Sequence, residues 1–519
     1  MRIDRTQNAI RGIAAGLCMK LYQMVVPFLM RTVMIYTMGV EYLGLNSLFT
    51  SILHILNLAE LGVGAAMVFS MYKPIAEDDT ACICALLKLY RRYYRMIGVI
   101  IGVVGLMLTP FIPKLIAGTV PEGINVYWLY LLNLGSTVLS YWLFAYRSSL
   151  LQAHQRRDVI SLVMLAANVV QHILQILILL YLRNYYLYVI VMLLCTALNN
   201  VLSDVVTIRM YPQYRPQGQL DRETQASIMG RIRDIFTGKL GSVVLQYADT
   251  IVLSAFMGLT MLAIYQNYFF ILSSVLAIVE IIISSITAGL GNSFVMESKG
   301  KNYADMRTFT FMFLWLTGMC TCCFLGMYQP FMELWMGEAL MLPYGMVISF
   351  ALYFFVFALN RLLSVYKDAA GLWHMDRFNP LVCAIVNLAL NLLLIRPLGL
   401  YGVVLSTVIA LAAIGIPWVL RNLFTGFFER GQLMPYVKVI LKFVLLTAFA
   451  GGIVSAVGTV CPAEPWLALL CNMLVSVLVP NVLFLIVFYR DEQFRQALRF
   501  ADRLTKNKLR LEKRLLPKE

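Results

Sequence analysis

The sequence predicts an all-α polytopic membrane protein with fourteen transmembrane helices in two related lobes. Three observations carry this prediction: an apolar composition, a regular alternation of basic residues along the chain, and a polar pattern that recurs after about 220 residues. Of the 519 residues, 60% are hydrophobic and only 13% are charged, whereas about 25% charged is usual for soluble domains.

Apolar runs of about 20 residues are long enough to cross the roughly 30 Å of hydrocarbon in a bilayer. The chain contains fourteen such runs, in order near residues 12–36, 43–67, 94–117, 124–147, 158–181, 185–208, 238–258, 262–290, 308–327, 344–366, 378–396, 400–420, 436–457 and 466–489.

Basic residues test this count, because short loops rich in Lys and Arg stay in the cytoplasm. With the N-terminus inside, 36 of the 42 basic residues fall in the inner segments or toward the inner ends of the spans, and only Lys114, Arg183 and Arg396 fall in the outer loops or at the outer ends. We therefore expect a multi-pass membrane protein with both termini in the cytoplasm. The net charge of +15 indicates contact with anionic membrane lipids and does not imply nucleic acid.

Polar residues carry the repeat. A shift of 220 relates Tyr146, Arg147, His154 and Arg157 to Tyr366, Lys367, His374 and Arg377. A shift of 219 relates Met38-Gly39-Val40 to Met257-Gly258-Leu259. Each copy holds six spans, an even number, so both copies enter the membrane in the same direction. They should be parallel repeats about an axis along the membrane normal, with a cavity between them.

Five segments follow from the spans and the repeat, and helices 13 and 14 have no counterpart in it. We expect an N-terminal six-helix lobe over 1–210, a cytoplasmic linker and surface helix over 211–237, a C-terminal six-helix lobe over 238–425, helices 13 and 14 over 426–489, and a basic cytoplasmic tail over 490–519.

Two further segments are amphipathic. Leu86, Tyr90, Tyr93 and Tyr94 alternate with basic residues, and the tail spaces Phe494, Leu498, Ala501, Leu504, Leu511 and Leu515 for one helical face. Such segments are typical of helices that lie on the inner membrane surface. Docking of a partner protein is the alternative.

Ionisable side chains inside spans cost several kcal/mol unless they face water or a partner, so each is a functional candidate. Two helices carry them as stripes at spacings of three or four residues: Lys20, Gln23, Pro27 and Arg31 on helix 1, and Lys239, Ser242, Gln246 and Asp249 on helix 7. Because Lys20 and Lys239 are repeat counterparts, both stripes should face the pseudo-symmetry axis. Lys20, Arg31, Lys239 and Arg361 are the candidate cationic residues of the cavity, and contact with the lipid headgroups is the alternative for Lys20, Arg31 and Arg361.

Uncharged polar residues accompany these stripes. Helix 5 carries Asn168 and His172, and its counterpart, helix 11, carries Asn387 and Asn391. Together with Gln23 and Gln246 they are candidates for the polar lining of the cavity. Hydrogen bonding between packed helices is an equally weighted alternative.

Three carboxylates are candidates for coupling or gating. Glu60 and Glu280 are counterparts near the inner ends of helices 2 and 8, where pairing with a basic residue at an inner gate is expected. Asp249 is the most central carboxylate and suits either Na⁺ or H⁺ coupling or a salt bridge with Lys20 or Lys239.

An enzyme is disfavoured. The outer loops are short, so there is little room for the site of a membrane glycan polymerase or ligase. The ten cysteines lie mostly in apolar spans without a second ligand cluster, so we expect neither a bound metal nor another cofactor, and no catalytic residues.

Three motifs resemble a known group of transporters. Tyr42-Leu43-Gly44-Leu45-Asn46, Asn57-Leu58-Ala59-Glu60-Leu61-Gly62-Val63-Gly64 and Tyr72-Lys73-Pro74-Ile75-Ala76 are similar to segments of Wzx-type polysaccharide flippases. These belong to the multidrug/oligosaccharidyl-lipid/polysaccharide (MOP) exporter superfamily, which includes the MATE transporters.

The resemblance implies a MATE-like pair of six-helix lobes around a cationic cavity, in the plasma membrane of a bacterium. It implies that the substrate-binding cations of this cavity are Lys20, Arg31, Lys239 and Arg361. It also implies a transport function. Members move an undecaprenyl-diphosphate-linked oligosaccharide from the inner to the outer leaflet for surface polysaccharide assembly, by alternating access. Polysaccharide polymerase and glycosyltransferases are candidate partners. A multidrug or cation antiporter and a peptidoglycan-precursor flippase of the same superfamily are the alternatives.

Overall fold

The computed structural model describes residues 5–460 and 464–504, which are almost entirely helical and contain no strand. Within these ranges, 12 helical stretches are long and apolar enough to cross a membrane. One of them, Lys239–Met296, contains two predicted spans, and α5 (Val126–Trp142), with 17 residues, supplies another. Every predicted span therefore coincides with a helix, and the predicted fold class is confirmed.

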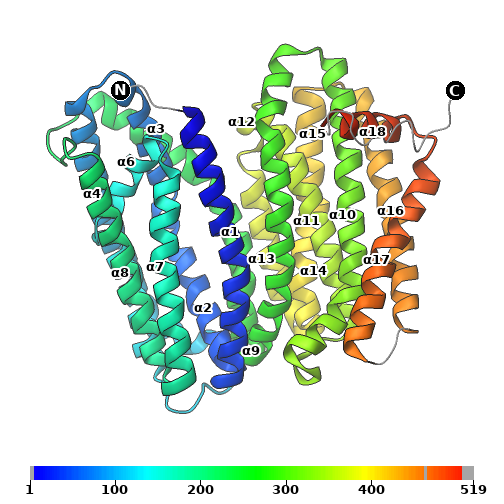
Figure 1. Cartoon of the computed structure of the whole chain (residues 1–519), viewed down its shortest axis with the longest axis horizontal. Coiled ribbons are helices and arrows are strands. Elements are labelled where there is room, and N and C mark those ends of the chain that lie inside the picture. Colours follow the sequence, from blue (N-terminus) through cyan, green and yellow to red (C-terminus); the bar gives the residue numbers. More distant parts are fainter. Residues whose placement is uncertain (1–4, 461–463, 505–519) are drawn as a thin grey trace. The chain divides into compact units, whose positions relative to one another are not determined.

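Two compact units divide the chain between Gln266 and Asn267. Besides α5, unit 1 contains α1 (Arg5–Thr37), α2 (Val40–Leu56), α3 (Val63–Ala76), α4 (Thr80–Leu108), α6 (Ser148–Ala153), α7 (Arg157–Leu177), α8 (Tyr185–Met210) and the first part of α9 (Arg222–Met296) (Figure 1). The unit boundary thus falls inside α9.

Unit 2 is built around α10 (Lys299–Met336). The other helices of unit 2 are the remainder of α9, α11 (Tyr344–Ala369), α12 (Trp373–Asp376), α13 (Asn379–Leu398), α14 (Leu400–Ala410), α15 (Ile416–Gly426), α16 (Leu433–Gly458), α17 (Pro465–Phe488) and α18 (Glu492–Leu504). The two helices after the second repeat, α16 and α17, both pack on α10, where Gly318 gives Thr447 and Phe484 room to approach closely.

Gly39 and Gly258 interrupt two helical paths at equivalent positions of the repeat. Gly39 separates α1 from α2 with φ +114°, and Gly258 kinks α9 with φ +83°. Glycine adopts positive φ without the steric cost that a Cβ brings. The relation that the sequence indicated between these two segments is therefore visible in the backbone.

The first amphipathic segment does not lie on the membrane surface. Leu86, Tyr90 and Tyr94 are buried inside unit 1, on α4, which continues without a break into the third predicted span. Similarly, the surface helix expected before residue 238 is continuous with the following span in α9. The prediction of a lipid-facing apolar side was wrong for α4 because α3 and α5 cover it.

The described part of the tail also packs on its own chain. Phe494 and Leu498 of α18 are buried, and the Phe494 ring stacks on Trp315 of α10 with ring centroids 5.7 Å apart. The Thr308 hydroxyl donates a hydrogen bond to Gln496 at 2.7 Å. Here too the surface prediction was wrong for the residues described, whereas Leu511 and Leu515 lie outside them.

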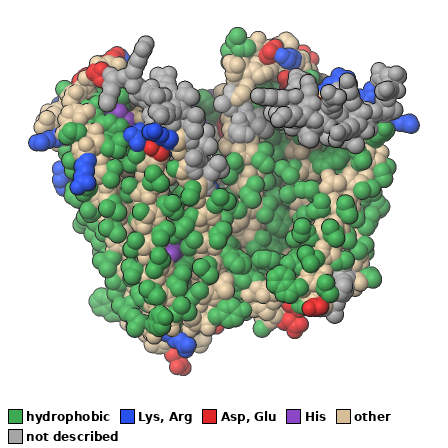
Figure 2. Space-filling model, in the orientation of Figure 1, with side chains coloured by type: hydrophobic (Ala, Val, Ile, Leu, Met, Phe, Trp, Pro, Cys, Tyr) green, Lys and Arg blue, Asp and Glu red, His purple; other side chains and the backbone are tan. Residues whose placement is uncertain are grey.

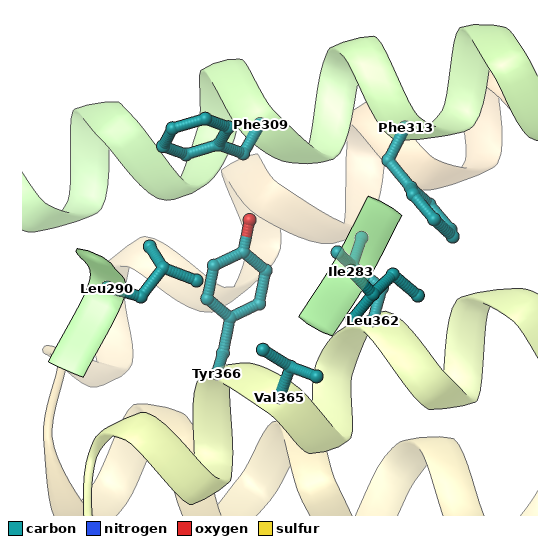
Figure 3. A pocket seen from close by; sticks show the side chains of 7 residues that line it. All are labelled: Ile283, Leu290, Phe309, Phe313, Leu362, Val365 and Tyr366. Carbon is teal, nitrogen blue, oxygen red and sulfur yellow. The ribbon is translucent and has the colours of Figure 1, made fainter. Parts of the chain in front are cut away.

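Charge and packing follow the membrane pattern. Figure 2 shows hydrophobic side chains over the middle of the helices, with Lys, Arg, Asp and Glu gathered near their ends. The surroundings of Tyr366 in unit 2 are tightly filled: Figure 3 shows its ring among Leu290, Phe309 and Val365, beside a cavity of only about 20 Å³. Tyr146, the counterpart of Tyr366, is buried in unit 1.

Candidate functional site

On α1, a polar stripe lies beside an apolar one. Lys20 and Gln23 are exposed, and Leu21 and Val25 on the adjoining face are each 64% exposed. α1 packs against α7 and α2, and these contacts leave the four side chains exposed. The apolar stripe suits lipid, whereas a lysine at this depth requires water or an anionic partner.

The first part of α9 presents a second polar stripe in unit 1. Lys239, Ser242 and Gln246 are exposed, at spacings that keep them on one helical face. Asp249, next on that face, is only 6% exposed. Among the described residues, neither Lys20 nor Lys239 has an ion-pair partner. Unit 1 therefore exposes two ammonium groups together with amides and a hydroxyl.

Arg31 lies near the far end of α1 and is held by its neighbours. Its Nη1 donates to the main-chain carbonyl of Gln266 over 3.4 Å, and Tyr188 lies within electrostatic reach. Tyr188 in turn stacks on Tyr185, with ring centroids 5.5 Å apart. Arg31 is thus half-buried in an aromatic setting, unlike the exposed Lys20.

Glu60 lies at a break between two helices. It ends the short 3₁₀ turn Asn57–Glu60 after α2, and Gly62, with φ +90°, begins the next helix. Tyr94 donates a hydrogen bond to Glu60 Oε1 at 2.7 Å, and Tyr90 donates to Tyr94 at 2.8 Å. Tyr141 is a further hydrogen-bonding group at this carboxylate, and Lys239 lies within electrostatic reach.

Glu280 and Arg361 form an ion pair in unit 2. Arg361 Nε donates to Glu280 Oε2 at 3.0 Å, and its Nη2 donates to the other carboxylate oxygen, so the contact is bidentate. The two side chains are 42% and 43% exposed. The pairing expected for Glu280 with a basic residue is present, and it engages the cation that the sequence indicated for cargo binding.

The carboxylates of the two repeats have equivalent partners. Glu60 and Tyr141 are 81 residues apart, and so are Glu280 and Arg361. The second repeat therefore replaces a tyrosine hydroxyl by a guanidinium at the same position relative to its glutamate. The carboxylate of the second repeat therefore has a charged donor where that of the first has a neutral one.

Polar residues of α7 join helices of unit 1. His172 Nδ1 lies 2.7 Å from the Tyr22 hydroxyl of α1 and 2.8 Å from the main-chain oxygen of Asn168. Gln175 donates to the main-chain oxygen of Tyr188 on α8 at 3.2 Å. His172 is therefore placed in the contact between α1 and α7, and Asn168 one turn before it is half-buried.

Asn387 and Asn391 are both 0% exposed, between α13 and α14. Asn387 donates to the Thr407 hydroxyl at 2.8 Å and to the Ser406 hydroxyl at 3.4 Å. The Ser406 hydroxyl in turn donates to Asn391. In this structure the two asparagines lie in a helix interface, where they satisfy each other's hydrogen bonds.

Several partners were not identified from sequence. Tyr94 and Tyr141 surround Glu60, and Tyr22 contacts His172. Tyr141 could have been identified from the sequence as a partner of Glu60, because it occupies the counterpart position of Arg361. Tyr22 and Tyr94 come from other helices, and no sequence spacing indicates such contacts.

Comparison with solved structures identifies the fold. The lipid II flippase MurJ in an inward closed conformation superposes with a TM-score of 0.66 at 15% identity, covering 93% of this chain and 99% of that chain. An inward-facing multidrug resistance MATE family transporter of the MOP superfamily gives 0.59 at 14% identity (82% and 99% covered). A MATE structure in the bent conformation gives 0.53 at 13% (83% and 96%).

No protein-family model and no curated protein sequence matches the chain. At these identities the structural similarity establishes the fold, which is that of MOP-superfamily flippases and transporters. The chain is a multi-pass membrane protein whose structural neighbours are transporters and flippases.

Proposed function

We propose that this protein is a flippase that moves an undecaprenyl-diphosphate-linked oligosaccharide from the inner to the outer leaflet by alternating access. A diphosphate that carries a polar glycan cannot cross hydrocarbon unaided, because burying charged and polar groups without partners is costly. The polyprenyl tail can stay in lipid. A protein surface that offers charge-assisted hydrogen bonds to phosphate and amide groups to sugars lowers this barrier without covalent chemistry.

The observation that carries the proposal is the exposure of Lys20 and Lys239 without ion-pair partners, each on a helix that also exposes amide groups. A lysine near the inner end of an apolar span is costly to bury unless it meets water or an anionic group, and for Lys239 the Glu60 carboxylate lies within electrostatic reach. The similarity to a structure of a lipid II flippase supports this class of cargo. The polysaccharide-type motifs at Tyr42–Asn46 and Asn57–Gly64 favour an oligosaccharide over the peptidoglycan precursor.

A multidrug or cation antiporter is the alternative within the fold. Organic cations call for accessible carboxylates, but Glu280 is paired with Arg361, Glu60 accepts from Tyr94, and Asp249 is buried. The accessible charge on the polar stripes of unit 1 is cationic. The exposed lysines, Lys20 from the first repeat and Lys239 from the second, therefore support an anionic cargo more than a cationic one.

Deletion of the gene, followed by mass spectrometry of lipid extracts, tests the proposal. The expected result is accumulation of an undecaprenyl-diphosphate oligosaccharide on the inner leaflet. Accumulation of the peptidoglycan precursor would instead identify that lipid as the cargo. Unchanged lipids together with increased sensitivity to cationic dyes would refute the flippase in favour of drug export.

A further inference from the structure

Unit 2 contains a large cavity that the proposed transport does not use. It has a volume of about 1170 Å³ and lies where the end of α15 meets α12 and the start of α16. This volume is at the upper end of the range for small-molecule sites, which is about 300 to 1,000 Å³. The cavity is large enough for a headgroup together with parts of attached acyl chains.

The walls of the cavity are mostly apolar. The lining side chains without charge or amide groups are Met375, Ala413, Ile414, Pro417, Trp418, Leu420, Phe424, Thr425, Leu433 and Val437. The Trp418 indole donates to the main-chain oxygen of Met375 at 3.3 Å, which fixes the ring at the wall. Asn422, also in the lining, is buried and bonded to Asp376.

Two arginines supply the only charges that line the cavity in the described part of the chain. Arg421 on α15 and Arg430 in the following turn are both exposed, and neither has an acidic partner among the described residues. The nearby carboxylates are already engaged: Asp376 with Lys367 at 3.1 Å, and Glu429 in the capping box of the turn. The cavity therefore combines an apolar wall with two guanidinium groups that have no ion-pair partner in the described part of the chain.

The cavity also lies at the depth of lipid headgroups. The span Leu400–Gly426 ends and the span Arg430–Gly458 begins at this turn. A tryptophan and basic side chains at the end of a span are typical of the membrane–water boundary. Apolar wall, boundary position and paired guanidinium groups together match one class of molecule, an anionic diacyl phospholipid.

We propose that this cavity binds one anionic phospholipid, with its phosphate between Arg421 and Arg430 and its acyl chains along Ile414, Pro417 and Val437. Guanidinium groups suit phosphate because they donate two parallel hydrogen bonds. The lipid would fill the junction between α15 and α16. The proposal concerns a structural lipid and is independent of the identity of the cargo.

Native mass spectrometry of the purified full-length protein tests the proposal, with phosphatidylglycerol and phosphatidylcholine of identical acyl chains as probes. We expect one phosphatidylglycerol to bind about 30-fold more tightly than phosphatidylcholine, because each of the two arginines near an anionic lipid contributes about fivefold. The double variant Arg421→Gln/Arg430→Gln should lose that preference. Ala413→Trp, which fills the cavity, should weaken binding of both lipids.

The matched control is Arg209→Gln/Lys299→Gln, which removes two exposed charges elsewhere and should retain the preference. If this control loses the preference for phosphatidylglycerol to the same extent, the preference reflects overall charge and the proposed site is wrong. Displacement of phosphatidylglycerol by inorganic phosphate alone, or by undecaprenyl phosphate at equal concentration, would also overturn it, because the occupant would then be free phosphate or a polyprenyl lipid.

Discussion

The Glu41 carboxylate accepts a hydrogen bond from the Thr260 hydroxyl at 3.2 Å, and these two residues are 219 positions apart, the interval of the repeat. At the same place Gly44 of α2 has no room for a Cβ beside the main chain of Leu259. The segments that follow Gly39 and Gly258 therefore meet inside unit 1.

Gly258→Ala should destabilise the protein by about 1 to 3 kcal/mol, the usual cost of a sparsely populated backbone conformation. Its φ is +83°, and an added Cβ would lie 2.7 Å from the main-chain oxygen of Ala117. Gly230→Ala, on the same helix with open space around it, is the control and should not destabilise. Thermal unfolding in detergent measures both variants, and equal unfolding temperatures would contradict the account.

Asn387→Leu should lower stability by about 1 to 3 kcal/mol, because it removes a fully buried amide that donates hydrogen bonds to the hydroxyls of Ser406 and Thr407. Transport per folded molecule should be unchanged. Unfolding and transport are measured on the same preparation. A variant of normal stability without transport would instead assign Asn387 to the cargo cavity in another conformation.

The Glu280–Arg361 pair should show a coupling energy of about 0.2 to 1 kcal/mol, because both side chains are more than a third exposed. Unfolding of Glu280→Gln, Arg361→Gln and the double variant gives this value through a double-mutant cycle. The exposed pair Lys301–Glu297 provides the comparison and should couple no more strongly. Strictly additive effects at Glu280 and Arg361 would show that the observed contact contributes nothing.

His154 should make stability depend on pH. It is 4% exposed, and burial lowers its pKa below the ordinary value of 6.5. The unfolded chain then binds more protons below about pH 6.5, so stability is complete above that pH and falls as the pH drops toward the lowered pKa. Unfolding temperatures between pH 8 and pH 5 should show this fall, where about 6.5 marks its onset.

His154→Gln should remove this part of the pH dependence. His374→Gln is the matched control, since His374 is the repeat counterpart of His154 but is exposed. If wild type and His154→Gln lose stability in parallel on acidification, another group is responsible.

The fold was predictable because its signals are local. Span length and the glycine pair at 39 and 258 can each be read from the chain, and each corresponds to a structural feature. The amphipathic segments were misplaced for a physical reason: an apolar face at Leu86 or Phe494 looks the same whether lipid or another helix covers it. Only the tertiary arrangement decides between them.

The candidate site was less predictable, because a polar residue inside a span can either face a cavity or form hydrogen bonds between packed helices. Lys20 and Asn387 are both polar residues on apolar helices, yet one is exposed and the other is fully buried in hydrogen bonds. Helix spacing indicates which residues share a face but not what that face contacts. The assignment of Lys20, Arg31, Lys239 and Arg361 to the cargo therefore stays a prediction.

Translocation by the purified protein in liposomes tests the central claim most directly. The cargo is an undecaprenyl-diphosphate oligosaccharide, and its exposure on the opposite leaflet is followed with an impermeant reagent. Lys20→Ala/Lys239→Ala should abolish movement while the protein stays folded, and Lys299→Ala/Lys438→Ala, which removes two exposed lysines elsewhere, should not. Normal movement by the Lys20→Ala/Lys239→Ala variant would contradict the account.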